Sequence, residues 1–425
     1  MTSKTRSALK IPRGIFAMLT LTLIAAGPAL SAQHYTIIHE FTPARGNYAT
    51  GHLAIDAAGN IYGTTRFGGI TTGLCQNRAC GLVYKLSKAT GSWTETILHR
   101  FTDSSGDGAD PQGGVMVDAA GNIYGTTATG GAHNQGTVFE LSPNATGGYS
   151  YQVIYTLGNG SMDGTNPIGT LALDAAGNLY GTTADFDGAG NVFMLSPTSG
   201  GTWTETVLFG FKNGSDGGYP ASGVTLDSSG NLYGTTGTGG MLTGPCKFYP
   251  GCGVVFKLSP APGTWSETLP YTFPGNYNGK LPANAGVTFD AAGNLYGSTA
   301  QGGMTNCNCG EIFELSPDGT GGWTHSVLYT FKGTSADPNF DLALDTAGNL
   351  YGVTLSSSGT VFKLSPGSTG TWQKTVLHTF VGTTTNGPDG ANPLGGVTFD
   401  SAGNLYGTTS AGGINGGGVL YEITP

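Results

Sequence analysis

Charged side chains are scarce in this sequence. Asp, Glu, Lys and Arg make up only 10% of the 425 residues, against about 25% in an average soluble domain. Basic residues are the smaller group, with 17 Lys and Arg against 26 Asp and Glu. Binding to phosphate backbones needs a surplus of basic residues on one face, so we expect no nucleic-acid partner.

The sequence also lacks an apolar run of membrane-spanning length. The uncharged apolar stretch at residues 15–26 has twelve residues, whereas a spanning helix needs about 20. Four basic residues precede this stretch, and the small residues Ala29, Ser31 and Ala32 follow it. This layout predicts a secretory signal peptide over residues 1–32. We therefore expect a secreted protein, extracellular or periplasmic, without a membrane span. Its formal net charge is then −13, from 13 basic and 26 acidic residues.

Glycine is abundant, with 75 residues, and it returns at fixed places in an internal repeat. The pattern Asp-x-x-Gly-Asn, followed by an aliphatic residue, Tyr and Gly, occurs seven times at intervals of 53 to 63 residues. This spacing leaves room for about four short strands per unit. The copies begin at Asp56, Asp118, Asp174, Asp227, Asp290, Asp345 and Asp400.

One unit shows the expected strands. Residues 224–227 alternate apolar and polar side chains, residues 228–231 form a turn, and residues 232–236 make the second strand of a hairpin. The third strand covers residues 254–258 and is expected to stop at Ser259-Pro260, because proline has no N–H for the ladder. The fourth covers residues 265–273. No unit has the 3.6-residue apolar period of a helix.

Seven units of four antiparallel strands predict an all-β fold, a seven-bladed β-propeller in one domain over residues 33–425. Residues 34–41 match the fourth-strand pattern, while the chain finishes on a third strand at residues 419–423. We therefore expect the N-terminal strand to complete the last blade and leave the ring without an open seam.

Two phrases of the last unit, residues 392–400 and Gly403-Asn404-Leu405-Tyr406-Gly407-Thr408-Thr409, resemble the choice-of-anchor, GloVer-type tandem repeat of secreted bacterial proteins. More distantly they are similar to NHL-type and streptogramin lyase-like propellers. The resemblance covers essentially all of the chain after residue 32. It implies a secreted propeller of unsettled activity.

Six cysteines lie in three of the long loops between second and third strands, as Cys75/Cys80, Cys246/Cys252 and Cys307/Cys309. In an exported chain such close pairs predict local disulfides. Zinc binding is the alternative, but the spacings match no common zinc pattern. For Cys307 and Cys309 the disulfide stays open, because so small a ring can be strained.

Other repeated residues fit structural roles. Each repeated aspartate starts a tight turn, where its carboxylate can accept a backbone N–H two residues on. The recurrent tyrosine, Tyr62 through Tyr406, is expected to pack between blades. We expect the tryptophans that open most fourth strands to cover the blade edge: Trp93, Trp203, Trp265, Trp323 and Trp372.

Two further sets of residues are candidates for chemistry, the fourth-strand histidines and a repeated acidic turn. His39, His99 and His378 occupy a fourth-strand slot that other blades fill with Tyr or Phe, so the slot favours a flat ring. An acidic turn precedes several first strands, and turn formation is favoured over calcium binding because no loop supplies a recognised calcium ligand set. These turns begin at Asp107, Asp163, Asp216 and Asp389.

His52 differs from the other histidines. It lies four residues before the repeated aspartate, a position that opens the innermost strand near the channel mouth. We call this position the slot. Three blades have a polar residue there, His52, Thr170 and Asp341, and the other four have glycine: Gly114, Gly223, Gly286 and Gly396. We therefore name these three as candidate ligand-binding residues, with His and Asp able to act as base and orienter or as metal ligands. Blade 7 lies between the blades of His52 and Asp341, which leaves open whether their side chains meet.

The sequence shows no Ser-His-Asp order and no metal-spaced histidine cluster. Our first hypothesis is a secreted, non-catalytic binding or scaffold protein, a monomer without cofactor, that presents one loop face to a glycan, a cell-envelope component or a protein. The alternative is a metal-assisted lactonase or lyase at the channel mouth, and the fold does not decide between them.

Overall fold

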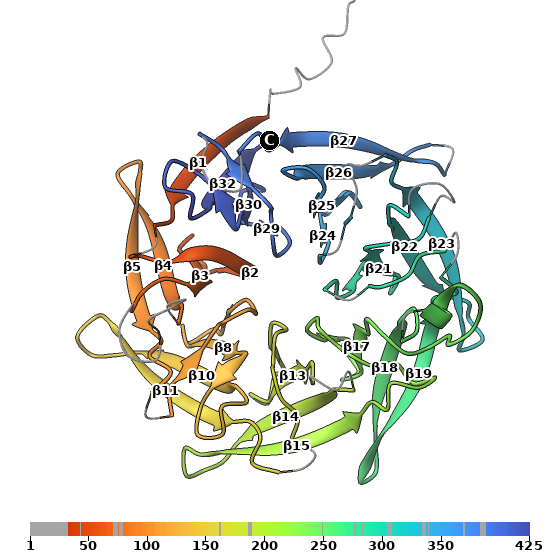
Figure 1. Cartoon of the computed structure of the whole chain (residues 1–425), viewed down its shortest axis with the longest axis horizontal. Helices are drawn as coiled ribbons and strands as arrows, with labels where there is room; N and C mark the ends of the chain where they lie inside the picture. The colour runs from red at the N-terminus through yellow and green to blue at the C-terminus, as the bar shows by residue number, and fades with distance from the viewer. Residues whose placement is uncertain are drawn as a thin grey trace, which may run out of the picture. The chain divides into compact units, whose positions relative to one another are not determined.

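Seven four-stranded antiparallel sheets stand around a common centre, as Figure 1 shows. The computed structural model describes residues 33–425 except 43, 71–74, 76–79, 105, 161–162, 186–188, 249, 276–277, 283, 304–307, 334–336, 339, 369 and 383–387. Each sheet is one blade, numbered 1 to 7 along the chain. The predicted all-β, seven-bladed propeller is confirmed.

In every blade the strands follow one another from the centre outward. The innermost strands are β2 (Asn47–Ile55), β7 (Met116–Val117), β12 (Ala172–Leu173), β16 (Thr225–Leu226), β20 (Thr288–Phe289), β24 (Ala343–Leu344) and β29 (Thr398–Phe399). The second strands are β3 (Ile61–Phe67), β8 (Ile123–Thr127), β13 (Leu179–Thr183), β17 (Leu232–Thr235), β21 (Leu295–Thr299), β25 (Leu350–Thr354) and β30 (Leu405–Thr408).

In blades 2 to 7 the outer half contains the longer strands. The third strands are β4 (Leu82–Ala89), β10 (Thr137–Pro143), β14 (Asn191–Pro197), β18 (Val254–Ala261), β22 (Glu311–Pro317), β26 (Thr360–Pro366) and β32 (Val419–Thr424). The fourth strands are β5 (Ser92–Arg100), β11 (Tyr149–Thr156), β15 (Trp203–Gly210), β19 (Thr264–Thr272), β23 (Trp323–Thr330), β27 (Trp372–Thr379) and β1 (His34–Glu40).

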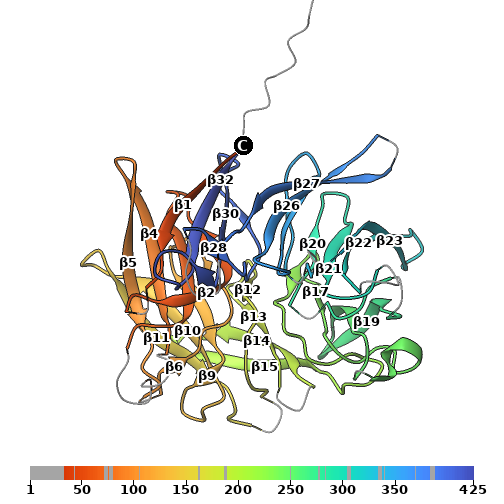
Figure 2. The same ribbon diagram turned by 45° about the horizontal axis from the view of Figure 1, so that its top comes forward.

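The ring closes as predicted. β1 pairs antiparallel with β32, in a register that sets His34 opposite Thr424 and Glu40 opposite Val419. Figures 1 and 2 both place the C-terminus beside β1. The first and last strands of the propeller therefore share blade 7, so neither is left as an unpaired edge.

In blade 4 the second and fourth strands lie within one residue of the predicted bounds, whereas the first is shorter and the third longer than predicted. The innermost strand of blade 4 has only two ladder residues, Thr225 and Leu226. The backbone just before it packs closely against blade 3, since a Cβ on Gly223 would lie 2.2 Å from the carbonyl oxygen of Thr170. The third strand does not stop at Pro260 but runs to Ala261. Beyond Leu258 it pairs only with the fourth strand, so a residue without an N–H is tolerated at the open edge.

The loops on one face carry additional short ladders and two disulfides. β6 (Gly108–Ala109) pairs with β9 (Thr129–Gly130), which Figure 2 shows, and β28 (Gly390–Ala391) pairs with β31 (Ala411–Gly412). Cys75 and Cys80 are bonded, as are Cys246 and Cys252 beside the short 3₁₀ helix η2 (Gly244–Phe248), and both predictions are confirmed. Cys307 lies outside the described residues. Within the described ranges no helix is long and apolar enough to cross a membrane.

The repeated aspartates close the turn between the first and second strands. In blade 1, Asp56 Oδ1 accepts the backbone N–H groups of Ala58 and Asn60, both at 2.9 Å, and Oδ2 accepts the Asn60 amide at 2.7 Å. The hydroxyl of Tyr62 donates to Oδ2 at 2.9 Å. Burial opposes ionisation, but these hydrogen bonds outweigh it and hold the pKa of Asp56 below its ordinary value. The predicted turn role is confirmed in every blade.

Neighbouring blades meet through aromatic pairs, which corrects the expectation for tryptophan. Each tryptophan lies edge-on to the recurrent tyrosine of the preceding blade, with ring centroids 6.1 to 6.4 Å apart, in the pairs Trp93–Tyr406, Trp203–Tyr124, Trp265–Tyr180, Trp323–Tyr233 and Trp372–Tyr296. The twist of each sheet brings its outer strand over the inner strands of the preceding blade. These rings therefore join blades, in edge-to-face geometry.

The fourth-strand histidines do occupy a slot for a flat ring. His99 stacks on Tyr151 of the next blade, with centroids 3.5 Å apart and planes 6° apart, and His378 stacks on Tyr35 in the same way. Beside His99, Asp107 accepts the backbone N–H of Thr102 at 2.9 Å and the hydroxyl of Tyr151 at 2.6 Å. This acidic turn therefore ties its own loop to the next blade, as a turn residue.

Candidate functional site

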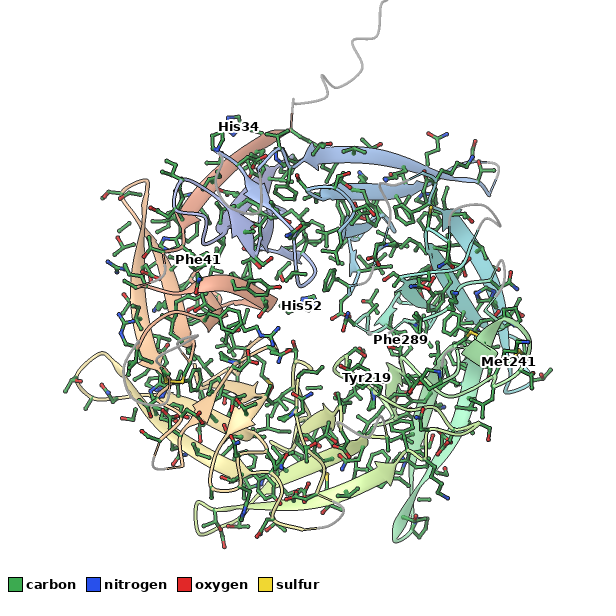
Figure 3. The ribbon with its side chains drawn as sticks, viewed as in Figure 1. His34, Phe41, His52, Tyr219, Met241 and Phe289 are labelled. Carbon is green, nitrogen blue, oxygen red and sulfur yellow. A yellow bond between two sulfur atoms is a disulfide. The ribbon has the colours of Figure 1, made fainter. Side chains whose placement is uncertain are left out.

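The candidate site lies where β2 and its counterparts reach the centre of the ring. Figure 3 shows His52, a residue of β2, beside the central opening. Its Nε2 atom lies 2.6 Å from Oδ2 of Asp341 in blade 6. The two side chains therefore meet, although blade 7 stands between their blades, and this answers the question that the sequence left open.

Two glycines make this contact possible. A Cβ on Gly396, the blade 7 residue of the same slot, would lie 2.7 Å from Cε1 and 2.9 Å from Nε2 of His52. The imidazole thus crosses blade 7 through the space that this glycine leaves empty. On the other side, the backbone N–H of Gly286 donates to Oδ1 of Asp341, and a Cβ there would lie 2.9 Å from that oxygen. The pair is therefore built from four positions of one slot.

Thr170 occupies the same slot in blade 3 and lies near the pair. Its Oγ1 accepts the backbone N–H of Gly114 at 3.1 Å. A Cβ on Gly114 would lie 2.4 Å from the carbonyl oxygen of His52 and 2.8 Å from Oγ1 of Thr170. Gly114 is therefore in contact with both residues, and the three polar residues of the slot surround the channel at one level.

Two cavities meet at this level. The one at the mouth, which we call the mouth pocket, has a volume of about 230 Å³ and is lined by residues of every blade, from Gly51 in blade 1 to Gly395 in blade 7. The other has a volume of about 250 Å³. His52, Thr170 and Asp341 line both cavities. They form the floor of the mouth pocket.

The contact favours the ionised form of both side chains at the floor. Burial lowers the pKa of His52, but the attraction of the Asp341 carboxylate outweighs it and raises that pKa above the ordinary value. Burial likewise raises the pKa of Asp341, but the imidazolium and the N–H of Gly286 outweigh it and lower the pKa. The side chains of His52 and Asp341, 26% and 32% exposed, face the pocket as a hydrogen-bonding pair.

The sequence analysis did not identify the polar and aromatic residues of the pocket rim. Arg66 and Tyr48 line the pocket beside His52. Arg66 donates from Nε and a terminal nitrogen to Asp110, at 2.6 and 3.0 Å. The repeat itself distinguishes Arg66, because no other blade has a charged residue at the equivalent position. The residues there are Ala128, Ala184, Gly237, Ala300, Leu355 and Ser410.

The donor set at the floor does not fit a catalytic metal. Such sites use about three protein ligands and keep one position open. Here Nε2 of His52 is directed at Asp341, and no group of three or more His, Cys, Asp or Glu that could hold a metal ion occurs among the described residues. We therefore derive no chemical step through a metal.

Several solved structures resemble the chain at low sequence identity. The periplasmic gluconolactonase PpgL of Pseudomonas aeruginosa is 14% identical, with a TM-score of 0.48 over 85% of this chain and 96% of that one. A putative 6-phosphogluconolactonase of Bacteroides fragilis is 13% identical, with a TM-score of 0.46 over 82% and 88%. A protein of unknown function from Dyadobacter fermentans is also 13% identical, with a TM-score of 0.44 over 92% and 98%. Such distances carry no argument about activity.

Sequence comparisons give a family. No curated protein matches the chain. The model of the Gloeobacter/Verrucomicrobia repeat matches residues 71–284 and 243–425, which together span well over half of the sequence. The seven blades are the structural form of that repeat. The chain therefore belongs to the Gloeobacter/Verrucomicrobia repeat family.

Proposed function

We propose that this protein is an exported, non-catalytic binding propeller that holds a polar ligand in the mouth pocket. One observation carries the proposal. The three residues that break an otherwise glycine slot, His52, Thr170 and Asp341, converge on the floor of one pocket that all blades line. Ligand sites are concave and contain a few convergent polar groups.

The floor suits a ligand that exchanges hydrogen bonds. The imidazole of His52 can donate, the carboxylate of Asp341 is an acceptor, and the hydroxyl of Thr170 can be either. Apolar side chains, among them Phe340 and Leu394, also line the pocket. This combination favours a compact ligand with several polar groups and an apolar side.

Export is part of the proposal. The signal peptide predicted over residues 1–32 would deliver the chain to an oxidising compartment. The bonds Cys75–Cys80 and Cys246–Cys252 support this, since disulfides persist outside the cytoplasm. We propose that the exported protein works as a monomer.

A metal-assisted lactonase or lyase is the second candidate function. The observation that favours it is the contact of His52 with Asp341, because a carboxylate beside an imidazole can orient it for proton transfer. The donor set described above argues against a resident metal. The binding proposal therefore stands first.

The test compares the exported form with the double variant His52→Gly and Asp341→Gly, in which both positions take the residue that four other blades carry. Thermal unfolding is recorded with a panel of polyols, mono- and oligosaccharides and aldonolactones. A ligand at about 100 times its Kd stabilises the folded state by about 2.7 kcal/mol. We expect at least one compound to raise the Tm of the wild-type protein and not that of the variant.

Two outcomes decide against the proposal. Equal stabilisation of wild type and variant would place the ligand elsewhere. Turnover of an aldonolactone that depends on an added divalent ion and is lost in the variant would establish the second candidate instead. Lactone hydrolysis is followed by proton release, with and without added metal.

A further inference from the structure

The rim of the mouth pocket between blades 1 and 2 departs from the repeat. Arg66 and Phe67 are the last two residues of β3 in blade 1, where the other blades carry small or polar residues apart from Leu355. The counterparts of Phe67 are Thr129, Asp185, Thr238, Gln301, Ser356 and Ala411. Blade 1 alone therefore adds an aromatic ring and a guanidinium at this point.

Tyr48 is the third large side chain of the rim, and blade 4 also carries a tyrosine, Tyr219, at the corresponding position. Each blade has one left-handed residue at the corresponding position, which lies within β2 in blade 1 and ahead of the innermost strand in the other blades. Its φ is between 54° and 64° in Tyr48, Asp110, Asn166, Tyr219, Leu281, Asp337 and Asn392. Asn and Asp tolerate this conformation, whereas a bulky residue is a poor fit. Strained residues of this kind cluster at functional sites, so the aromatic ring of Tyr48 needs an explanation other than backbone preference.

The rim residues form one connected cluster. The rings of Tyr48 and Phe67 lie 5.4 Å apart at 53°, and the guanidinium carbon of Arg66 is 5.3 Å from the centroid of Phe67. Asp110 fixes the guanidinium through two hydrogen bonds and also accepts the side-chain amide of Gln112 at 3.0 Å. Arg66 and Asp110 remain 30% and 21% exposed.

Core packing does not explain these aromatics. Within the described part of the chain, neither Tyr48 nor Phe67 belongs to any of the hydrophobic clusters that hold the blades together. Both rings are partly exposed. They are held instead by Arg66 at the edge of the mouth pocket, which Tyr48, Arg66 and Gln112 line together with His52.

We propose that Tyr48, Arg66, Phe67, Asp110 and Gln112 form a subsite for one sugar ring of a neutral saccharide, which extends the mouth site and so rests on the proposed function. Aromatic faces pack against the C–H face of a pyranose, while planar groups such as the guanidinium, carboxylate and amide exchange paired hydrogen bonds with neighbouring hydroxyls. Apolar rings beside a fixed polar network supply both kinds of contact.

Charge selects a neutral saccharide. The guanidinium of Arg66 is neutralised by Asp110, and the side chain of His52 is paired with the carboxylate of Asp341. Arg66 and His52 are the cationic side chains among the described residues that line the pocket. A phosphorylated or uronic acid ligand would therefore meet no uncompensated cation in the pocket. It would also be repelled by the protein as a whole, because the exported form carries a net charge of −13, from 13 basic and 26 acidic residues.

The experiment uses variants that return blade 1 to the residues of other blades. Binding of the hexamers of cellulose, xylan, starch, laminarin and chitin, and of hexagalacturonate, is measured by isothermal titration calorimetry on the exported form. We expect one or more neutral hexamers to bind, and Phe67→Thr and Tyr48→Asn each to raise Kd at least tenfold. Tyr48→Asn should raise the Tm at the same time, because Asn suits the left-handed conformation.

Tyr219→Asn is the matched control, because Tyr219 is left-handed in the same way but does not line the mouth pocket. It should raise the Tm and leave Kd unchanged. The subsite is wrong if no neutral hexamer binds, if hexagalacturonate binds more tightly, or if Phe67→Thr and Tyr48→Asn bind like wild type.

The two proposals fail separately. If a small ligand still needs His52 and Asp341 while the rim variants change nothing, the mouth site stands and the subsite is refuted. If hexamer binding is lost in the rim variants but kept in the variant His52→Gly with Asp341→Gly, the subsite stands and the floor is not part of the site.

Discussion

His52 reaches Asp341 because glycines in the same slot leave space for the imidazole and donate to the carboxylate. The contact therefore depends on Gly396 and Gly286 as well as on the two charged residues, unlike an isolated ion pair on a surface. Exposed ion pairs contribute little to stability. This pair is partly buried and bonded to the backbone, so we expect it to have a measurable effect with a definite dependence on pH.

We predict that Asp341→Gly lowers the free energy of unfolding by about 1.5–3 kcal/mol at pH 5–6, the usual range for a hydrogen bond to a charged group. The pKa of His52 is raised in the folded protein, so its contribution is complete below about pH 6.5 and is lost as the pH rises through the raised value. The pKa of Asp341 is lowered, so its contribution is present above about pH 3.9 and is lost as the pH falls through the lowered value.

Urea unfolding of wild type and Asp341→Gly at a series of pH values measures this difference. Asp341→Asn is the control, because it keeps an acceptor for the N–H of Gly286 and removes only the charge. A difference that stays constant from pH 3 to pH 9 would show that the pair is not ionised in the folded protein.

At the scale of single elements, the long loops depend on local covalent links. Cys246 and Cys252 are fully buried and pack with Phe273 in the interface between blades 4 and 5. The backbone of Gly275 lies against the disulfide, since a Cβ there would be 2.4 Å from Sγ of Cys252. The disulfide thus takes the place of an apolar side chain in a loop that has few of its own.

We predict that the double variant Cys246→Ser and Cys252→Ser loses about 2 kcal/mol of stability, the loop-entropy value for a ring of this size. The residues are six positions apart, so the ring is short. Urea unfolding measures the loss, with Cys75→Ser and Cys80→Ser as the equivalent change in blade 1. An unchanged midpoint for both double variants would mean that contacts other than the disulfides fix these loops.

At the scale of the whole molecule, several seams between blades bury acidic side chains. Burial, with the neighbouring Asp163, raises the pKa of Glu205 to about 8. Burial, with Asp216, raises that of Glu267 to about 7, and burial alone raises that of the fully buried Glu311 to about 8. These carboxyl groups take up protons on folding at neutral pH, which is the reverse of the turn aspartates.

We predict that the wild-type protein is more stable at pH 5 than at pH 8. An acid whose pKa is raised by folding binds more protons in the folded state, so stability falls as the pH rises from about 4.3 towards the raised value. Urea unfolding of the triple variant Glu205→Gln, Glu267→Gln and Glu311→Gln should show a smaller loss over this range. The pair His52–Asp341 also weakens with rising pH, but that loss is common to both proteins. An equal loss in the two would refute the assignment.

The sequence by itself determined the features that depend on neighbouring residues. The aspartate turn, the four-strand unit and its sevenfold return predict the propeller, because each blade repeats a pattern of alternation and turns along a short stretch of chain. The match of residues 34–41 to a fourth strand likewise predicts the closure by β1. The cysteine pairs Cys75/Cys80 and Cys246/Cys252 follow from their spacing within one loop.

Only the tertiary structure decided which residues of different blades meet. Comparison of the slots identifies His52 and Asp341 as unusual, but their contact depends on the tilt of three blades and on the space above Gly396. The packing of Trp93 on Tyr406 depends in the same way on sheet twist. Twist and tilt arise from the summed packing of whole sheets, which no short stretch of sequence records.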